Sequence, residues 1–331
     1  MGLDSRSRFS IAQFAVCAVL ACVAFTRAIA QQAPDALTAQ VNEIVAAHKG
    51  KVALYAEDLA SHKVIAVDAD VPVKTASVIK LGILYEALEE IREGKARWDE
   101  PIVLKEDDAV SGSGILQFMD APLTLTLRDV LTLMIDMSDN TATNLMIDRF
   151  GTASVDARIA SIGLTNTYLY KKISKPATGP MPADQPKFGL GKTTAHEMAL
   201  LITRFAKCQL STDAPTAADV ALCSTAVEIL QHQFYRDDIP RYLETIDSSE
   251  QGTAIANKTG ALNAVRNDVA LIGTKRGLVV LSIFTYDNAD QSWQTDNEAE
   301  LTIARLAKVI VQAWAPDGLT PETLKPTAAG H

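Results

Sequence analysis

The chain has 331 residues, 48% of them hydrophobic, which is enough to bury a full core as one large domain or two interleaved lobes. Its formal net charge is −9, and the first thirty residues contribute +2 (Arg6, Arg8 and Arg27 against Asp4), so the remainder carries −11. Such an acidic chain is poorly suited to bind nucleic acid or an anionic membrane. We expect a globular protein whose partner is a small molecule or a wall component.

The N-terminal thirty residues have the pattern of a secretory signal peptide. Arg6 and Arg8 precede an apolar run over residues 11–25, and Ala28-Ile29-Ala30 is a small-x-small cleavage site. We expect cleavage near Ala30, a mature chain beginning at Gln31, and a secreted or periplasmic protein with no stable membrane partner. A retained N-terminal anchor is the alternative, although the apolar run is short for a membrane span.

Only Cys208 and Cys223 remain after this cleavage. In an oxidising compartment two such cysteines either form a disulfide or stay as free thiols. The five histidines show no paired spacing, and His196-Glu197 begins like H-E-x-x-H with Leu200 at the position of the second histidine. We therefore predict no metal and no other cofactor.

From residue 34 onward, apolar periodicity predicts a helix over residues 34–48 and then two short strands, 51–57 and 63–68, joined as a hairpin. A second helix is predicted over residues 77–91. The segment Ser111-Gly112-Ser113-Gly114 that follows lacks the first glycine of a G-x-S-x-G elbow, so we interpret it as a loop.

The central part of the chain is predicted to be mainly helical. A helical pattern begins at Thr124, breaks at Ser138-Asp139-Asn140 and resumes up to Gly151. Residues 170–194 contain many Lys, Pro and Gly residues, which favours a long surface loop. Helices are then predicted over residues 195–207 and 217–231.

The last part of the chain supplies strands over residues 252–259, 267–274 and 278–286 and a helix over residues 296–314. We predict an α+β fold with a five-stranded antiparallel sheet, two strands coming from the N-terminal hairpin and three from the C-terminal part, flanked by the terminal helices. The predicted catalytic domain spans residues 31–315. Its α/β lobe comprises 34–74 and 251–314, its all-helical lobe comprises 75–250, and 316–331 form a tail.

The candidate catalytic residues begin with Ser77 and Lys80, at the head of the second predicted helix. Residues three apart share a helix face, so the Lys80 amine can reach the Ser77 hydroxyl. The helix start also offers unpaired N–H groups that favour a developing oxyanion. A serine can be activated in this way without a histidine. The alternative is a surface lysine one turn along a helix, and this pair alone does not decide between them.

Two further motifs decide the question. Ser138-Asp139-Asn140 lies between two helices and Lys258-Thr259-Gly260 ends a predicted strand. Alone, the first is typical of a helix N-cap. Because both occur once, in this order and context after Ser77-x-x-Lys80, coincidence is remote. With these motifs the chain resembles the penicillin-recognising serine acyltransferases, and most closely the class A β-lactamases, over most of its length from Val52 to Trp314.

The resemblance implies three catalytic residues. Ser77 is the nucleophile, Lys80 is its proton partner, and Ser138 relays the proton to the leaving nitrogen. Acyl transfer from a lactam needs these groups together with fixed donors at the oxyanion. The resemblance assigns the donors to the backbone N–H groups of Ser77 and Ala261. A positive charge on Lys258 would help keep the Lys80 amine neutral.

The resemblance also implies substrate-binding residues. Asn140 orients the substrate amide, and Lys258-Thr259-Gly260 holds the substrate carboxylate through the Lys258 amine and the Thr259 hydroxyl. Arg266 occupies a position where many family members carry a carboxylate-binding arginine. A solvated arginine is the alternative.

One departure from the family concerns turnover. Members that hydrolyse antibiotics rapidly carry a glutamate in the loop after the second motif, where it activates water against the acyl-enzyme. Aligning Gly163-Leu164 and Thr193-Thr194 with their family counterparts puts Ile173 at that position. No carboxylate lies between Leu164 and Asp184. Asp184, or Lys80 itself, therefore remains as the candidate base.

The resemblance thus implies a secreted serine hydrolase of β-lactamase type that opens β-lactam amides through an acyl-serine intermediate, with slow deacylation. The alternatives are a D,D-peptidase or esterase of the same family, and a penicillin-binding sensor that stays acylated. A sensor is expected to have a membrane tether and a signalling domain, and we find a pattern for neither. The expected partner is a β-lactam or wall peptide, not nucleic acid, and the expected state is a monomer.

Overall fold

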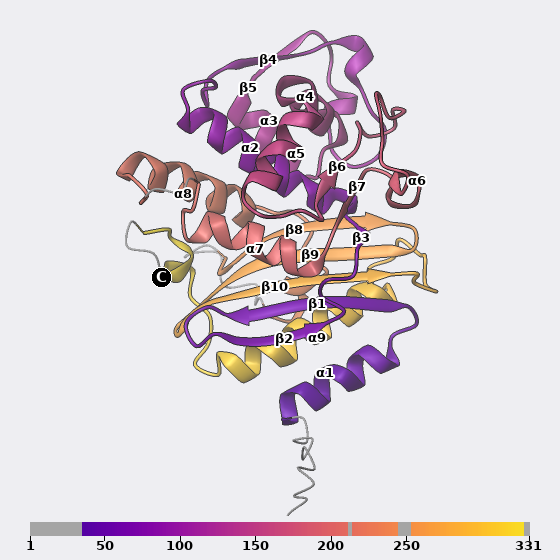
Figure 1. Ribbon diagram of the computed structural model, residues 1–331, viewed down its shortest axis with the longest axis vertical. Coiled ribbons are helices and arrows are strands. Elements are labelled where there is room, and N and C mark those ends of the chain that lie inside the picture. Colours follow the sequence, from indigo (N-terminus) through magenta and orange to yellow (C-terminus); the bar gives the residue numbers. More distant parts are fainter. Residues whose placement is uncertain (1–34, 211–213, 244–252, 328–331) are drawn as a thin grey trace, which may run out of the picture. The chain divides into compact units, whose positions relative to one another are not determined.

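Segments from both ends of the chain build one antiparallel sheet (Figure 1). The computed structural model describes residues 35–210, 214–243 and 253–327. The sheet order is β2-β1-β10-β9-β8, with all neighbours antiparallel. The strands are β1 Lys51–Asp58, β2 Lys63–Val67, β8 Ile255–Leu262, β9 Val265–Thr274 and β10 Gly277–Tyr286. The predicted five-stranded antiparallel sheet is confirmed.

The sheet is covered on both faces. Side chains along β9 alternate between two cores: Val269 and Leu271 join one, Ala270 and Ile272 the other, as the two-residue repeat of a strand requires. Gly277, at φ 132°, forms the tight hairpin between β9 and β10. Strands buried on both sides have near-continuous apolar sequences, so the sequence alone indicated strands at β9 and β10.

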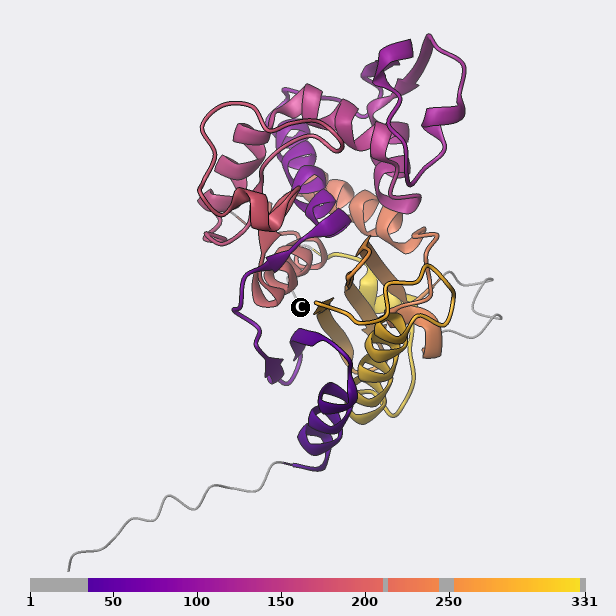
Figure 2. The same cartoon turned by 90° about the vertical axis from the view of Figure 1, so that its right-hand side faces the viewer.

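The terminal helices cover one face of the sheet. They are α1 Ala36–Ala47 and α9 Glu298–Trp314, and they lie next to each other (Figure 2). Val41 of α1 and Ile303 of α9 are fully buried in the core on this side. The prediction that the terminal helices pack on the sheet is confirmed.

Helices from the middle of the chain cover the other face (Figure 1). Their bounds are α2 Lys80–Arg92, α3 Leu127–Asp136, α4 Asn140–Phe150, α5 Thr152–Ser161, α6 Gln185–Phe188, α7 Ala195–Ala206 and α8 Ala217–Gln231. Helix α7 packs directly on the sheet, and α2 is surrounded by α3, α4, α5, α7 and α8. Every residue from Lys80 to Glu89 is buried, so α2 is the central helix of this lobe.

This lobe is not purely helical, because it also contains two small sheets. One pairs β4 Pro101–Leu104 with β5 Leu123–Thr126, and the other has the order β3-β7-β6, with β3 Val73–Lys74, β6 Tyr168–Leu169 and β7 Gly191–Thr193. Strands of two to four residues are too short to show an alternating pattern. The structure therefore adds them, and helix α5, to the predicted lobe.

Several predicted boundaries need correction. The helix predicted from residue 77 begins as a 3₁₀ turn, Ala76–Ile79 (η1), before α2. Strand β8 runs on to Leu262, so Lys258-Thr259-Gly260 lies inside a strand and not at its end. The described part of the predicted tail also belongs to the domain: Leu319 bridges to Thr274 of β9, and Leu324 is buried in the core.

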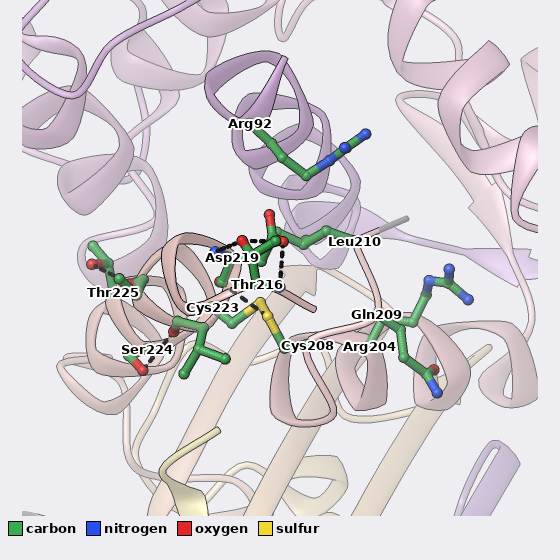
Figure 3. Close-up of a disulfide and its surroundings, with 12 residues drawn as sticks. Arg92, Arg204, Cys208, Gln209, Leu210, Thr216, Asp219, Cys223, Ser224 and Thr225 are labelled. Carbon is green, nitrogen blue, oxygen red and sulfur yellow. Dashed lines mark hydrogen bonds between the residues drawn. A yellow bond between two sulfur atoms is a disulfide. The ribbon is translucent and has the colours of Figure 1, made fainter. Parts of the chain in front are cut away.

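Cys208 and Cys223 form a disulfide, with their Cα atoms 5.5 Å apart (Figure 3). It joins the residues that follow α7 to the middle of α8, which decides between the two alternatives left open by the sequence. The predicted signal peptide, residues 1–30, lies outside the described residues. No helix in the described ranges is both long and apolar enough to cross a bilayer.

Candidate active site

Ser77 lies in η1, where the start of the central helix meets the edge strand β8. Gly260 of β8 is the point of closest approach. A Cβ atom at this position would lie 2.9 Å from the backbone nitrogens of Ser77 and Val78 and from the Thr75 carbonyl oxygen. The glycine of the third motif is therefore required by the packing of strand against helix start.

The backbone is strained at two points of the site. Ala76, next to Ser77, has a φ of 45°, and Ser138 has a φ of 51°. Residues with a Cβ atom adopt this left-handed conformation at a cost, and such residues concentrate at functional sites. The first two motifs thus each contain or adjoin a strained residue.

Lys80 is fully buried and directs its amine at the second motif. Its Nζ atom donates to the Ser138 carbonyl oxygen at 2.8 Å, to Ser138 Oγ at 3.0 Å and to Asn140 Oδ1 at 3.5 Å. Among the described residues no hydrogen bond joins Lys80 to the Ser77 hydroxyl, which the sequence predicted from their spacing. Burial, and then the charge of Lys258, hold the pKa of Lys80 well below its usual value.

Lys258 approaches Ser138 from the sheet. Its Nζ atom donates to Ser138 Oγ at 3.1 Å and to the Thr259 carbonyl oxygen at 2.8 Å. Burial lowers the pKa of Lys258 to about 7, although the charges of Asp268 and Asp136 oppose this change. The Ser138 hydroxyl thus lies between two buried lysine amines, and burial lowers the pKa of both.

The second motif also holds the predicted loop 111–114. Asp139 caps α4 and accepts two backbone N–H bonds from the residues after the loop, at 2.7 and 2.8 Å. Asn140 Nδ2 donates to the Ser111 carbonyl oxygen at 3.0 Å. A Cβ atom at Gly114 would lie 2.2 Å from the Asp139 carboxylate. The N-cap interpretation of this motif is therefore confirmed for Asp139, and the same turn places Ser138 against Lys80.

A cavity of about 540 Å³ opens over these groups. Its lining includes Ser77, Gly112, Ser113, Ser138, Thr259, Gly260 and Ala261. Since β8 is the edge strand of the sheet, backbone groups on its outer side have no strand partner and can bind an extended substrate. The three motifs thus meet at one cavity, with the amines of Lys80 and Lys258 bound to Ser138.

Arg266 does not line this cavity. Its side chain is 1% exposed, and Nε donates to Glu300 at 2.7 Å. Its two other nitrogens donate to backbone carbonyl oxygens of Leu262, Val265 and Ser292. The alternative of a solvated arginine is therefore wrong, because four hydrogen bonds hold the buried guanidinium.

The position of Ile173 is set by Asn144, a residue that sequence reasoning missed. Asn144 Oδ1 accepts the Ile173 N–H at 2.8 Å, and Asn144 Nδ2 donates to the Ile173 carbonyl oxygen at 3.0 Å. Asn144 lies one turn of α4 beyond Asn140, on the same face. Its spacing from the second motif could have indicated this role. The backbone of residue 173 is thus fixed against α4, and its side chain carries no ionisable group.

Asp184 is engaged elsewhere. Its carboxylate accepts from Lys192 Nζ at 2.7 Å and from the Tyr170 hydroxyl at 3.3 Å. The hydrogen bond from Lys192 lowers the pKa of Asp184. Asp184 is not among the described residues that line the cavity, so this geometry does not favour it as the base for deacylation.

Ser77 lies at a strained helix start, and beside it Ser138 is held by two buried lysines. On this fold, such a site is that of a serine hydrolase. The chain belongs to the β-lactamase enzyme family, whose model matches residues 36–314. A comparison with curated protein sequences found no match. The family resemblance stated from the three motifs is confirmed.

Solved structures agree with this assignment. A β-lactamase from Sphaerobacter thermophilus is 27% identical, with 84% of this chain and 96% of that chain covered and a TM-score of 0.71. A point mutant of PBP-A, solved as an acyl-enzyme with penicillin G, is 23% identical (84% and 96% covered, TM-score 0.68). An ancestral class A β-lactamase is 22% identical (84% and 99% covered, TM-score 0.68). The last two, at these identities, support the fold.

Proposed function

We propose that the protein is a secreted, periplasmic hydrolase that opens β-lactam amides through an acyl-enzyme on Ser77 and deacylates slowly. The observation that carries the proposal is the bridging Ser138 hydroxyl, which accepts from Lys80 at 3.0 Å and from Lys258 at 3.1 Å beside the Ser77 cavity. This arrangement combines a neutral amine, a proton relay and a positive charge in one site.

The acylation step follows from these groups. The Ser77 hydroxyl oxygen attacks the lactam carbonyl carbon, and its proton passes to the neutral Lys80 amine. The carbonyl oxygen becomes negative and is held by the backbone N–H groups of Ser77 and Ala261. When the C–N bond breaks, Ser138 donates a proton to the leaving nitrogen and recovers one from Lys80. Lys258 and Thr259 hold the substrate carboxylate.

Deacylation lacks the loop glutamate that rapidly hydrolysing family members carry. A water molecule must lose a proton as it attacks the acyl-enzyme, but Ile173 cannot accept one and Asp184 is bound to Lys192. Loss of a positioned general base typically costs about 10²–10⁴-fold in rate. The acyl-enzyme is therefore expected to accumulate.

The test is a reaction with a chromogenic cephalosporin, followed by absorbance and by intact mass. We expect a burst of about one equivalent, a slow steady rate and an acyl adduct on the protein. Ser77→Ala should abolish both burst and adduct while its circular dichroism spectrum is unchanged. Labelling of Ser77→Ala at the wild-type rate, or rapid turnover with no detectable adduct, would contradict the proposal.

A D,D-peptidase or esterase of the same family is the second candidate. The open outer edge of β8 beside Ser77 favours it, because an extended peptide can pair with an edge strand. Turnover of a D-alanyl peptide or ester that exceeds turnover of the cephalosporin would support this candidate. A sensor would instead stay acylated by the cephalosporin and hydrolyse neither substrate.

A further inference from the structure

The Ser77 cavity has an acidic wall that none of the three motifs supplies. Asp237, Asp238 and Glu300 line it together with the aromatic rings of Tyr235 and Trp293, a set we call the acidic pocket. Tyr235, Asp237 and Asp238 follow α8. Trp293 precedes α9, and Glu300 lies in the first turn of α9. Two distant segments thus bring carboxylates to one cavity.

Asp238 is the unusual member of this set. It is 7% exposed, and its buried Oδ1 atom has no hydrogen-bond partner among the described residues. Leaving a buried carboxyl oxygen unsatisfied is unfavourable. Burial, and then the neighbouring charges of Asp268 and Glu300, raise the pKa of Asp238 well above its usual value. A cation bound in the cavity would relieve the repulsion among these carboxyl groups.

Three described cations near the acidic pocket already have other hydrogen-bond or ion-pair partners. Arg266 is bound to Glu300 and to backbone carbonyl oxygens, Arg241 pairs with Asp296, and Lys258 donates to Ser138 and Thr259. Asp237 is exposed and forms no ion pair with a described residue. The acidic pocket therefore has an excess of carboxyl groups over available cations.

The aromatic rings of Tyr235 and Trp293 are also suited to bind a cation. Trp293 is 66% exposed and Tyr235 36% exposed, and the Arg266 guanidinium lies 4.5 Å from the Trp293 ring centre. This contact shows that the indole already accepts a cation, and much of its surface remains open. Aromatic faces beside carboxylates are the usual surroundings of a bound alkylammonium group.

We propose that the acidic pocket binds an ammonium group on the leaving-group side of the substrate. The inference rests on the proposed function, in which Thr259 holds the leaving-group carboxylate, and the pocket shares one cavity with Thr259. The preferred acyl donor then has a leaving group with a carboxylate near Thr259 and an amine farther out. A second carboxylate in place of that amine would be repelled.

The kinetic test uses three acyl donors with the same acyl group. Their leaving groups have equal length and end in a primary ammonium, its N-acetyl derivative or a carboxylate. Intact mass gives the second-order rate constant for acylation of Ser77 by each. We expect the ammonium donor to react about tenfold faster than the N-acetyl donor, as for a hydrogen bond to a charged group, and the carboxylate donor to be slowest.

Variants test which residues cause the faster reaction of the ammonium donor. Asp237→Asn and, separately, Glu300→Gln should reduce the ratio of ammonium to N-acetyl rate constants toward one. Asp287→Asn is the matched control, because Asp287 is an exposed carboxylate paired with Lys51 outside the cavity, and it should keep the wild-type ratio. A wild-type ratio near one, or a ratio that the first two variants leave unchanged, would overturn the inference.

A binding measurement separates this inference from the proposed function. The free ammonium-bearing leaving group is titrated into Ser77→Ala by calorimetry, and again into Ser77→Ala with Asp237→Asn. We expect about tenfold weaker binding in the double variant. If no donor acylates the wild type but this difference is found, the proposed function fails and the ammonium site is supported. If Ser77 is acylated but the two variants bind the probe equally, the ammonium site is wrong.

Discussion

Lys80 and Lys258 share one acceptor, the Ser138 hydroxyl, at 3.0 and 3.1 Å. Both amines are fully buried, and burial disfavours their charged forms. The charge of Lys258 is a further cause of the lowered pKa of Lys80. Burial thus disfavours a charge on either amine, and the charge of Lys258 further disfavours a charge on Lys80, so the state of the pair depends on pH.

We expect pH to change the acylation rate for a carboxylate-bearing lactam in two opposing ways. As pH rises through the lowered pKa of Lys80, the fraction of neutral base increases and acylation accelerates. As pH rises past about 7, where the pKa of Lys258 lies, Lys258 loses its charge and its hold on the substrate carboxylate. Acylation followed by intact mass from about pH 5 to about pH 9 checks this profile.

Lys258→Arg is the informative variant for the alkaline limb. Arginine stays charged over the whole range, so the fall above about pH 7 should disappear even if the absolute rate is lower. An alkaline limb that is identical in wild type and Lys258→Arg would show that another group causes it.

At the scale of elements, we expect the loop between β6 and β7 to control how fast the proposed acyl-enzyme is hydrolysed. Asn144 holds the Ile173 backbone through two hydrogen bonds. A side chain at position 173 can therefore be exchanged with the backbone retained. Because the family alignment puts the missing glutamate at position 173, this is the place where a base can be added.

We expect Ile173→Glu to speed deacylation by about 10²-fold, the lower end of the usual contribution of a general base. Ile173→Gln is the matched control, since it has the same shape and no basic carboxylate, and it should keep the slow rate. Asp184→Asn should also leave the rate unchanged, because Asp184 is already paired with Lys192. The lifetime of the adduct by intact mass measures all three. A longer lifetime in Asp184→Asn would establish Asp184 as the base after all.

The disulfide acts on two elements, since it connects the end of α7 to α8. Closing a loop of 15 residues restricts the unfolded chain and stabilises the fold by about 3 kcal/mol. We expect the double variant Cys208→Ala, Cys223→Ala to lose about this free energy of unfolding in urea. Dithiothreitol should weaken the wild type similarly and leave the variant unaffected. Equal unfolding free energies with and without the disulfide would refute this.

At the scale of the whole molecule, the site exists only where the lobes meet. Ser77 and Lys80 come from the central helix start, Ser138 from the helical lobe and Lys258 from the sheet. The contacts join these parts into one compact unit that begins at Ala36. The monomeric state stays a proposal.

The full chain expressed in a Gram-negative host should therefore appear in the periplasm as a monomer that starts at Gln31. The signal pattern before Ala30 is the reason. N-terminal sequencing, intact mass and light scattering test it. An uncleaved chain in the membrane fraction would favour the retained anchor, and a stable dimer would contradict the monomer.

The sequence by itself determined the family and the five-stranded sheet, and it located the three motifs that meet at the cavity. Long periodic segments such as β9 and α9 are covered by apolar partners along their length, so their patterns are readable without the structure. The three motifs are also local, because each depends on a few adjacent residues. The sequence did not predict the short strands, helix α5 or the exact ends of the elements, because an apolar pattern must repeat several times before it indicates a structure.

Only the tertiary structure decided what those groups touch. The spacing of Ser77 and Lys80 predicted a direct contact, but Lys80 turns to Ser138, which is 58 residues away, because a buried amine must find acceptors and the second motif supplies them. Arg266 turns to Glu300, and Asp238 meets Asp268 and Glu300, through register and packing that no local pattern encodes. Long-range electrostatics and desolvation depend on the folded surroundings, so the charge of the cavity could not be read from the chain.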